Sequence, residues 1–311
     1  MKILLIGGCG YIGSALYSKL TERGLSVSSV DLEWFGNSGL DNLNTDYSNI
    51  SPIWLSQFDT VVLLAGHSSA KMCENNPVSA HYNNVVNFVN LLSKLNNTQK
   101  LIYASSSSVY GNVSVQDVNE EYMDYKPVGY YDLTKKEIDL YARLSNIEYY
   151  GLRFGTVCGA SPNWRNDIML NAMYDKYMQN KEILLFNKAV WRPILGMNDL
   201  TSAIIKIIES KTDNRGLYNL ASFNLTAENI AYSMGEFLSC PVRVIENTQE
   251  IINTKLQSNS YNYTINCDKF SSTFNFSFGE DIKSIVESLK SNCDSCMRSN
   301  RSDIKPYKLE N

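Results

Sequence analysis

Tyr131 and Lys135 have the residue types and the spacing that proton-transfer chemistry requires. They lie in "YYDLTKKE", and a separation of four residues places both side chains on one face of a helix. A lysine ammonium one turn away stabilises a phenolate and so lowers the tyrosine pKa from its usual value of about 10. Tyr130 is the neighbouring alternative, but its partner at the same spacing is Thr134, which carries no charge. Tyr131 is therefore the candidate general base or acid, unless the pair is an ordinary surface pair.

A run of four serines ends a predicted strand in the stretch "YASSSSVYG". The run could be a polar linker between packed elements. It could also be the floor of an active site, in which one hydroxyl is used for chemistry. The serine run alone does not decide between these interpretations.

The stretch "IGGCGYIGS" contains the glycine pattern Gly7-x-x-Gly10-x-x-Gly13. It follows the first predicted strand and opens the first predicted helix. Glycine lets the backbone approach a pyrophosphate, and the helix N-terminus adds partial positive charge. Asp31 ends the second predicted strand, where a carboxylate accepts from a ribose 2′-hydroxyl and repels a 2′-phosphate. The pattern predicts NAD as cofactor, with a tight turn that holds no ligand as the alternative.

Other residues fall where such a cofactor would lie. Asp46 is expected in the loop after a third strand or its remnant, where its oxygen would accept from the adenine amino group; an ordinary turn aspartate is the alternative. Tyr11 and Ile12 lie inside the glycine loop. An oxidised nicotinamide beside Tyr131 would add positive charge and bring its pKa closer to neutral.

The elements that must position these residues alternate between strands and helices. Strands are expected at 2–7, 27–31, 59–66, 100–106 and 148–154, and helices at 14–24, 80–95 and 132–144. Strands alternating with helices pair in parallel through right-handed crossovers. The sequence therefore predicts an α/β fold with a doubly wound parallel sheet of the Rossmann type. Further along, helices are expected at 167–180 and 226–238, and strands at 182–186 and 216–221.

Composition excludes several classes of function. The chain has 311 residues, a net charge of −4 and no dense Lys/Arg run, which predicts no nucleic-acid partner. No stretch is apolar enough for a membrane span, and the N-terminus does not resemble a signal peptide. Seven scattered cysteines favour reduced thiols and a cytoplasmic location. Cys293 and Cys296 form a lone C-x-x-C pair, and with only two histidines in the chain no metal site is predicted.

Taken together, the glycine pattern, Asp31, "SSSSVYG", Tyr131-x-x-x-Lys135 and "LRFGTVCG" resemble the extended short-chain dehydrogenase/reductase family. More narrowly, they look like its NAD-dependent nucleotide-sugar epimerases and dehydratases. The resemblance implies a Rossmann domain, a smaller C-terminal α/β substrate domain, a nucleotide-sugar partner and a homodimer. The expected division is 1–160 with 195–221 for the Rossmann domain, 161–194 with 222–295 for the substrate domain, and 296–311 as a flexible tail.

The resemblance also implies a role for each matching residue. Ser106, four positions before the tyrosine of "SVYG", would hydrogen-bond the reacting sugar oxygen. Tyr131 would act as base or acid, and Lys135 would bind the nicotinamide ribose and tune Tyr131. Asn84, in "YNNVVNF", matches a helix asparagine that orders this site.

The loop after the fourth strand, "LLAGHSS", matches a segment that lies along the cofactor in the family. Ala65 and Gly66 are therefore expected cofactor contacts. His67 follows them and invites a catalytic role, although the Ser–Tyr–Lys set already supplies proton transfer. Cys158, at a position where many relatives have tyrosine, is expected to pack.

The serine run indicates which reaction the family resemblance favours. Family dehydratases carry an Asp-Glu pair directly after the catalytic Ser/Thr, and this chain has Ser107 and Ser108 there, which argues against dehydration. The "ASSSSVYG" form resembles 4-epimerases, including those acting on UDP-uronates, with a transient 4-keto sugar. One alternative is a one-way 4-dehydrogenase or 4-ketoreductase with the same site. Another is a regulator that senses the cofactor without turnover.

Substrate residues are assigned by the same resemblance. Expected contacts are Ser107, Ser108, Thr156, Arg165 and Arg192. Arg192 is a candidate for the diphosphate, with a salt bridge between domains as the alternative. The chain departs from relatives at Gly196, where they commonly have histidine, and at Thr156, where UDP-binding relatives commonly have asparagine. UDP-, GDP-, CDP- and dTDP-sugars therefore stay open.

Overall fold

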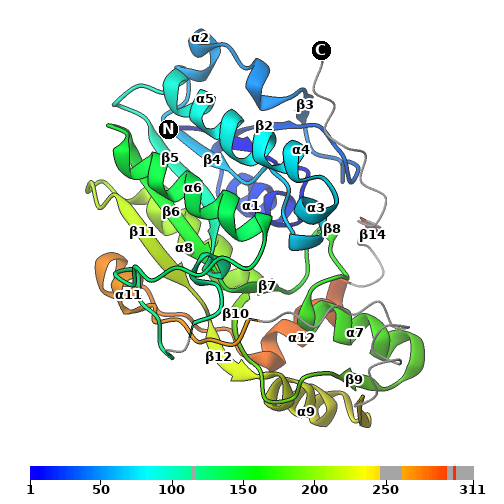
Figure 1. Ribbon diagram of the computed structural model, residues 1–311. Helices are drawn as coiled ribbons and strands as arrows, with labels where there is room; N and C mark the ends of the chain where they lie inside the picture. The colour runs from blue at the N-terminus through cyan, green and yellow to red at the C-terminus, as the bar shows by residue number, and fades with distance from the viewer. Residues whose placement is uncertain (114–115, 246–260, 293–296, 299–311) are drawn as a thin grey trace.

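The computed structural model describes residues 1–113, 116–245, 261–292 and 297–298 (Figure 1). Its largest element is a seven-stranded, fully parallel sheet in the order β11-β6-β5-β4-β1-β2-β3. The strands are β1 Lys2–Ile6, β2 Ser26–Asp31, β3 Asn42–Asn44, β4 Thr60–Leu63, β5 Lys100–Ser106, β6 Glu148–Phe154 and β11 Gly216–Leu220. The doubly wound Rossmann-type sheet predicted from the sequence is confirmed. Its strand order reverses between β1 and β4, which is where ligands bind in such sheets.

Side chains from both faces of this sheet are buried, as parallel pairing requires. Ile3 and Leu5 pack on one side under α1 (Tyr11–Glu22) and α8 (Met197–Glu209). Leu4 and Ile6 pack on the other side under α5 (Asn87–Lys94) and α6 (Tyr130–Leu144). These four of the five β1 side chains are fully buried. This double burial explains why the strands are continuous apolar runs in the sequence.

Shorter elements on this part of the chain are η1 Tyr47–Asn49, α2 Pro52–Leu55, α3 Ala70–Asn75 and η3 Ser107–Tyr110.

The single helix predicted for 80–95 is wrong in detail, because the structure divides this region into three parts. These are α4 (Pro77–His81), a π-helical turn η2 (Tyr82–Val86) and α5. A π turn inserts an extra residue into the helix and is frequently found at functional sites. Within this turn, Asn83 and Asn84, which are adjacent in sequence, both hydrogen-bond His67.

The strand predicted for 59–66 also ends early, at Leu63. The amides of Leu64 and Ala65 both donate to the carbonyl of Ile6. The chain therefore turns away from the sheet before Gly66, which frees the following residues to form a loop at its edge.

The rest of the described chain forms smaller layers beside the carboxyl edge of the sheet (Figure 1). One is a three-stranded sheet, and another is a parallel pair of β9 and β13. Three helices, α7, α9 and α12, pack around this pair. The elements are β7 Thr156–Cys158, β8 Asn163–Trp164, α7 Met169–Asn180, β9 Ile183–Leu185, β10 Trp191–Gly196, β12 Phe223–Thr226, α9 Ala227–Leu238, β13 Val242–Val244, α11 Asp268–Phe274 and α12 Ile282–Asn292.

The chain returns from β10 through α8 to the large sheet, where β11 pairs with β6. In the region expected to be a tail, Met297–Arg298 form β14, which pairs in parallel with β8. The rest of that tail, together with Cys293 and Cys296, lies outside the described residues. Within the described part of the chain, no helix is long and apolar enough to cross a membrane.

A buried ion pair fixes α6 to the sheet. Arg153 on β6 and Asp139 on α6 lie 2.9 Å apart between Nε and Oδ2, and each side chain is only 2% exposed. The hydroxyl of Tyr103 donates to the other carboxylate oxygen, and the guanidinium donates to the hydroxyls of Tyr110 and Tyr125. Buried charges persist only when partners of this kind satisfy them.

We predict that Arg153→Met destabilises the fold strongly, because it leaves the Asp139 carboxylate buried without a counter-ion. The expected loss is about 3–5 kcal/mol of unfolding free energy, measured by urea denaturation. Arg215→Met is the matched control, since its pair with Asp213 is more than 40% exposed on both sides, and its expected effect is below about 1 kcal/mol. Equal effects of the two substitutions would contradict the prediction.

Candidate active site

The glycine loop occupies the switch point between β1 and β4. Gly7 has φ +92°, and its amide donates to the carbonyl of Val30. A Cβ on Gly13 would lie 2.0 Å from the carbonyl oxygen of Gly7, and one on Gly7 would lie 2.4 Å from the amide of Ala65. Gly10 precedes α1 and offers no side-chain cap to its amides. The loop is thus closely packed on the protein side, and the N-terminus of α1 faces the groove in front of it.

A groove opens in front of this loop. Ten of the predicted site residues line it: Gly7, Gly10, Tyr11, Ile12, Gly13, Asp31, Asp46, Ala65, Gly66 and Arg165. Trp34, Phe35 and Asn83 also line it and were not foreseen from the sequence. Glycines at the loop and a carboxylate at the end of β2 are what a dinucleotide requires, so the residues present fit NAD.

The two carboxylates in the groove already accept hydrogen bonds from the backbone. Asp31 accepts from the amides of Cys9 and Glu33 at 3.0 and 2.7 Å. These bonds hold its carboxylate at the end of β2, where the sequence predicts a ribose contact. Asp46 caps η1 by accepting from the amide of Ser48 at 2.8 Å. The turn role weighed for Asp46 is therefore present, together with its place in the groove.

The serine run forms the end of β5 and the 3₁₀ turn η3. The Ser106 and Ser108 hydroxyls lie 2.8 Å apart, and Ser106 also accepts from the Ser108 amide. The Ser107 hydroxyl lies 3.0 Å from that of Tyr263. All three serines are buried. The run is therefore part of the packed interior at the carboxyl edge of the sheet, and the linker interpretation is wrong.

Tyr131 stands beside this turn, in the first turn of α6. Ser106 lies close enough to the Tyr131 side chain to lower the pKa of its phenol. Lys135 lies one turn further on, with its Nζ donating to the carbonyl of Ala104 at 2.7 Å and 5.8 Å from the centre of the Tyr131 ring. The structure thus brings Ser106, Tyr131 and Lys135 together from β5 and α6.

The protein without cofactor does not lower the pKa of the Tyr131 phenol, and the expected shift toward neutral also depends on an oxidised nicotinamide. Burial raises the pKa of the Tyr131 phenol to about 12, although the nearby Ser106 opposes the rise. Burial lowers the pKa of the Lys135 ammonium to about 8. Lys135 does not bring the Tyr131 pKa toward neutral by itself, because its ammonium points to a backbone carbonyl and the loss of solvent has the larger effect.

Asn84 and His67 form a support behind the groove. Asn84 accepts from the His67 amide and donates to the His67 carbonyl and to Thr134 on α6, so its amide group has partners within the protein. The His67 ring is 1% exposed, lies between Ser79 and Asn83, and burial lowers its pKa to about 4. A neutral, enclosed ring does not suit proton exchange with a substrate. Through its bonds to His67 and to Thr134, Asn84 joins the loop after β4 to the helix that carries Tyr131.

Of the three remaining substrate candidates, one lines the groove, and the other two lie on strands and are not among the groove-lining residues. Arg165 lines the groove, pairs with Asp167 at 2.7 Å and donates to Ser68. Arg192 on β10 donates to the carbonyls of Trp191 and Tyr261. Thr156 is half-buried on β7. Only Arg165 is placed in the cofactor groove.

Gly196, which departs from the family pattern, has a structural explanation. A Cβ at this position would lie 2.0 Å from Oε2 of Glu280. That carboxylate accepts from the amide of Asp199 and from the side chain of Asn198 at the start of α8. Glu280 lies 84 positions further along the chain, so sequence spacing gave no sign of this pairing.

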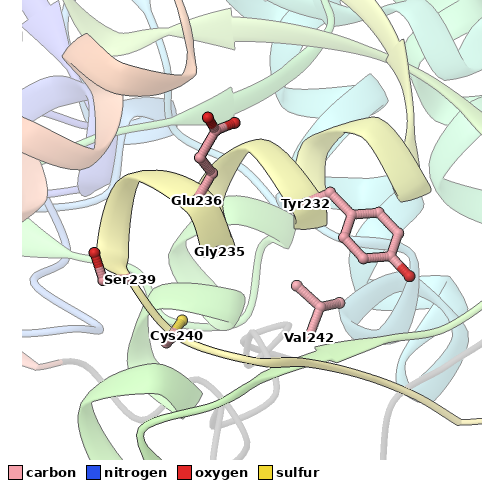
Figure 2. Close-up of a pocket in the computed structure, with 6 residues that line it drawn as sticks. All are labelled: Tyr232, Gly235, Glu236, Ser239, Cys240 and Val242. Carbon is pink, nitrogen blue, oxygen red and sulfur yellow. The ribbon is translucent and has the colours of Figure 1, made fainter.

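A second hollow lies away from this centre, between α9 and β13. Tyr232, Gly235, Glu236, Ser239, Cys240 and Val242 line it (Figure 2). None of the predicted site residues is among them. Within the described residues, no group of three or more His, Cys, Asp or Glu side chains is placed to hold a metal ion.

We predict that Gly13→Ala weakens NAD binding, because its methyl group collides with the Gly7 carbonyl and displaces the loop. The expected loss of affinity is roughly tenfold or more by isothermal titration calorimetry. Gly279→Ala is the control, since a Cβ there meets no atom within 4 Å. Unchanged NAD affinity in Gly13→Ala would show that the loop does not hold the cofactor.

Comparison with known proteins agrees with this geometry. The model of the NAD dependent epimerase/dehydratase family matches residues 3–221. Protein CapI of Staphylococcus aureus is 30% identical over 282 residues, covering 81% of this chain and 83% of that protein. UDP-glucuronate 4-epimerase 6 of Arabidopsis thaliana is 25% identical over 295 residues, covering 82% of this chain and 61% of that protein.

A solved structure shares the fold at lower identity. UDP-glucose 4-epimerase from Thermotoga maritima, with UDP-glucose, superposes with a TM-score of 0.80 and 21% identity, covering 94% of this chain and all of that one. The family match spans the sheet, the glycine loop, the serine turn and α6. The chain is therefore an enzyme of the NAD dependent epimerase/dehydratase family, and NAD is its cofactor.

Proposed function

We propose that the enzyme is a nucleotide-sugar 4-epimerase that works through a transient 4-keto sugar. The observation that carries this proposal is that Ser106 at the end of β5, Tyr131 in the first turn of α6 and Lys135 one turn further on lie together. The Lys135 Nζ donates to the carbonyl of Ala104 at 2.7 Å and lies 5.8 Å from the centre of the Tyr131 ring. A phenol and a hydroxyl held together can share one substrate oxygen, which is what oxidation of a secondary alcohol requires.

In this proposal Tyr131 removes the proton from the C4 hydroxyl and later returns it. Ser106 hydrogen-bonds the same oxygen and orients it, and Lys135 supplies positive charge behind the phenol. Bound NAD supplies the hydride acceptor and donor for C4, and its oxidised ring adds the positive charge that a phenolate needs. Because the chain alone holds the Tyr131 pKa at about 12, the tyrosine keeps its proton until that charge is present.

The polar groups around the serine turn argue against dehydration. Ser107 and Ser108 are hydroxyls where family dehydratases carry acids. The carboxylate next to Tyr131 in sequence, Asp132, accepts from the amides of Val128 and Gly129 and from a tyrosine hydroxyl. It is thus engaged in holding the start of α6. A one-way 4-dehydrogenase or 4-ketoreductase with the same site is the alternative.

We propose a sugar nucleotide as the substrate class, with the sugar at the serine turn. Ser107, Ser108, Thr156, Arg165 and Arg192 stay our proposed contacts. Arg165 is supported by its place in the groove and by its charge, which lowers the pKa of Tyr131. Two of the proteins named above are a UDP-glucuronate 4-epimerase and a UDP-glucose 4-epimerase, so UDP-glucuronate and UDP-glucose are the first compounds to test.

We also propose the division of labour between the two parts of the chain. Residues 1–160 with 195–221 would bind NAD, and residues 161–194 with 222–295 would bind the nucleotide. A cytoplasmic location is proposed too. It is supported by Cys9, Cys73, Cys158, Cys240 and Cys267, the cysteines within the described residues, all of which are free thiols.

We predict that the purified enzyme interconverts the C4 epimers of a UDP-sugar without lasting change at 340 nm. Product stereochemistry would be read by NMR on a panel of UDP-, GDP-, CDP- and dTDP-sugars. Tyr131→Phe should lower kcat by roughly a hundredfold or more. Tyr232→Phe is the control, because Tyr232 lies on α9 away from this site and is 49% exposed. A stoichiometric rise or fall at 340 nm with no epimer would overturn the epimerase proposal in favour of the one-way reaction.

We further propose that the enzyme is a homodimer joined through the outer face of α6. Apolar side chains that are 36–85% exposed gather there and on the neighbouring η2: Tyr82, Tyr130, Leu133, Leu140, Tyr141 and Leu144. Their spacing along α6 follows one helix face, and a second copy of the same face would cover it. The nucleotide-sugar epimerases that the sequence resembles commonly pair through such a helix bundle.

We predict that replacing Leu140 and Leu144 together by glutamate converts the dimer to a monomer in size-exclusion chromatography with light scattering. Charges on both helices would then face one another across the contact. Ile53→Glu is the control, because Ile53 lies on α2 and is 82% exposed. A monomeric wild-type protein at micromolar concentration would contradict the proposal.

A further inference from the structure

A segment from the C-terminal part of the chain reaches the catalytic helix. Residues 261–265 run beside β12, with the amide and carbonyl of Ile265 bonded to the side chain of Asn224 (Figure 1). The hydroxyl of Tyr261 donates to both carboxylate oxygens of Asp132, at 2.9 and 2.7 Å. The hydroxyl of Tyr263 lies 3.0 Å from that of Ser107. Two tyrosines of this segment thus touch the start of α6 and the serine turn.

Asp132 has two effects at the start of α6: it caps the helix, and it acts electrostatically on Tyr131. It is fully buried, and its Oδ2 accepts from the amides of Val128 and Gly129, which closes the first turn of the helix. It also directly follows Tyr131 in sequence, and its negative charge raises the pKa of that phenol. A group that hydrogen-bonds the Asp132 carboxylate therefore affects both the position of Tyr131 and the pKa of its phenol.

Tyr261, which lies outside α6, hydrogen-bonds the Asp132 carboxylate. A phenol that donates to a carboxylate forms a strong, charge-assisted hydrogen bond. The same residue accepts from Arg192 through its backbone carbonyl. Tyr261 therefore joins the proposed diphosphate residue to the helix that carries Tyr131.

We propose that Tyr261 is a positioning residue of the catalytic tyrosine, holding the first turn of α6 and partly neutralising Asp132 through one hydrogen bond. This inference rests on the proposed 4-epimerase function, since it assigns a task within that reaction. It extends the site to a residue 130 positions after Tyr131.

Other polar and charged groups also face Tyr131, and the proposal takes them as unchanged. They are Ser106 on β5, Cys73 on α3, Arg165 before α7 and Lys135 on α6. Burial and Cys73 raise the pKa of Tyr131, whereas Ser106 and Arg165 lower it. The substitutions below leave all of these side chains in place.

The test compares two substitutions that change the same hydrogen bond from opposite ends, one by removing the charge of its acceptor and the other by removing its donor. Asp132→Asn removes the negative charge and should move the acidic limb of the kcat–pH profile to lower pH. Tyr261→Phe leaves that charge less compensated and should move the limb to higher pH. Shifts of roughly half a pH unit in opposite directions are expected, with less than a twofold change in KM, because the Tyr261 carbonyl still accepts from Arg192. Shifts in the same direction, or loss of kcat in both variants without any shift, would overturn the proposal.

Two controls separate positioning from general damage. Tyr263→Phe breaks the contact to Ser107 without touching Asp132, and Tyr232→Phe alters a 49% exposed tyrosine on α9 (Figure 2). Neither should move the acidic limb. A shift in either one equal to that of Tyr261→Phe would count against the proposal.

Equilibrium unfolding tests the contact without any substrate. In urea, the Tyr261→Phe/Asp132→Asn double variant should lose less stability than the sum of the two single losses, because both substitutions act on one shared bond. Additive losses would show that the two side chains do not interact. If the wild-type enzyme turned over no nucleotide sugar, the proposed function would fail and with it the catalytic task of Tyr261, while this cycle would still decide the contact.

Discussion

The ion pair between Arg153 and Asp139 is the interaction on which the rest of the site depends. It ties the middle of α6 to β6 inside the protein, where each charge would be strongly unfavourable alone. Asp139 lies one turn beyond Lys135, and Lys135 lies one turn beyond Tyr131. A helix fixed at this point carries its first turn to a set place beside Ser106 at the end of β5. The parallel sheet supplies the second constraint, because it brings the ends of β1, β2, β4 and β5 to one edge.

The electrostatics of the site suit a proton that moves only when the cofactor is bound. Burial holds Tyr131 in its neutral form and brings the pKa of Lys135 to about 8. The pKa of each residue therefore differs clearly from its usual value in water. Buried groups with displaced pKa values are typical of catalytic sites, and they make the site sensitive to each added charge. Such sensitivity explains why Asp132 and its tyrosine partner, although they touch no reacting atom in the proposed reaction, matter to Tyr131.

Much of the fold and the centre of the site could be predicted from the sequence, because both depend on local patterns. Apolar runs give the strands, and the spacing of Tyr131 and Lys135 gives one helix face. The π turn could not be predicted from the apolar pattern, and its residues Asn83 and Asn84 contact His67, which lies 16 and 17 positions earlier in the chain. Contacts between distant segments were also hidden, as Tyr261 with Asp132 and Gly196 with Glu280 show. The effect of burial on the Tyr131 pKa could not be read from spacing either.

The central claim is that hydride leaves C4 of the sugar and returns to the same carbon within one turnover. The most direct measurement uses a UDP-sugar carrying deuterium at C4, with the product analysed by NMR and mass spectrometry. We predict that the epimer retains the deuterium at C4 and that no NADH accumulates in solution. Deuterium lost from C4, or a labelled NADH released with a 4-keto product, would contradict the claim.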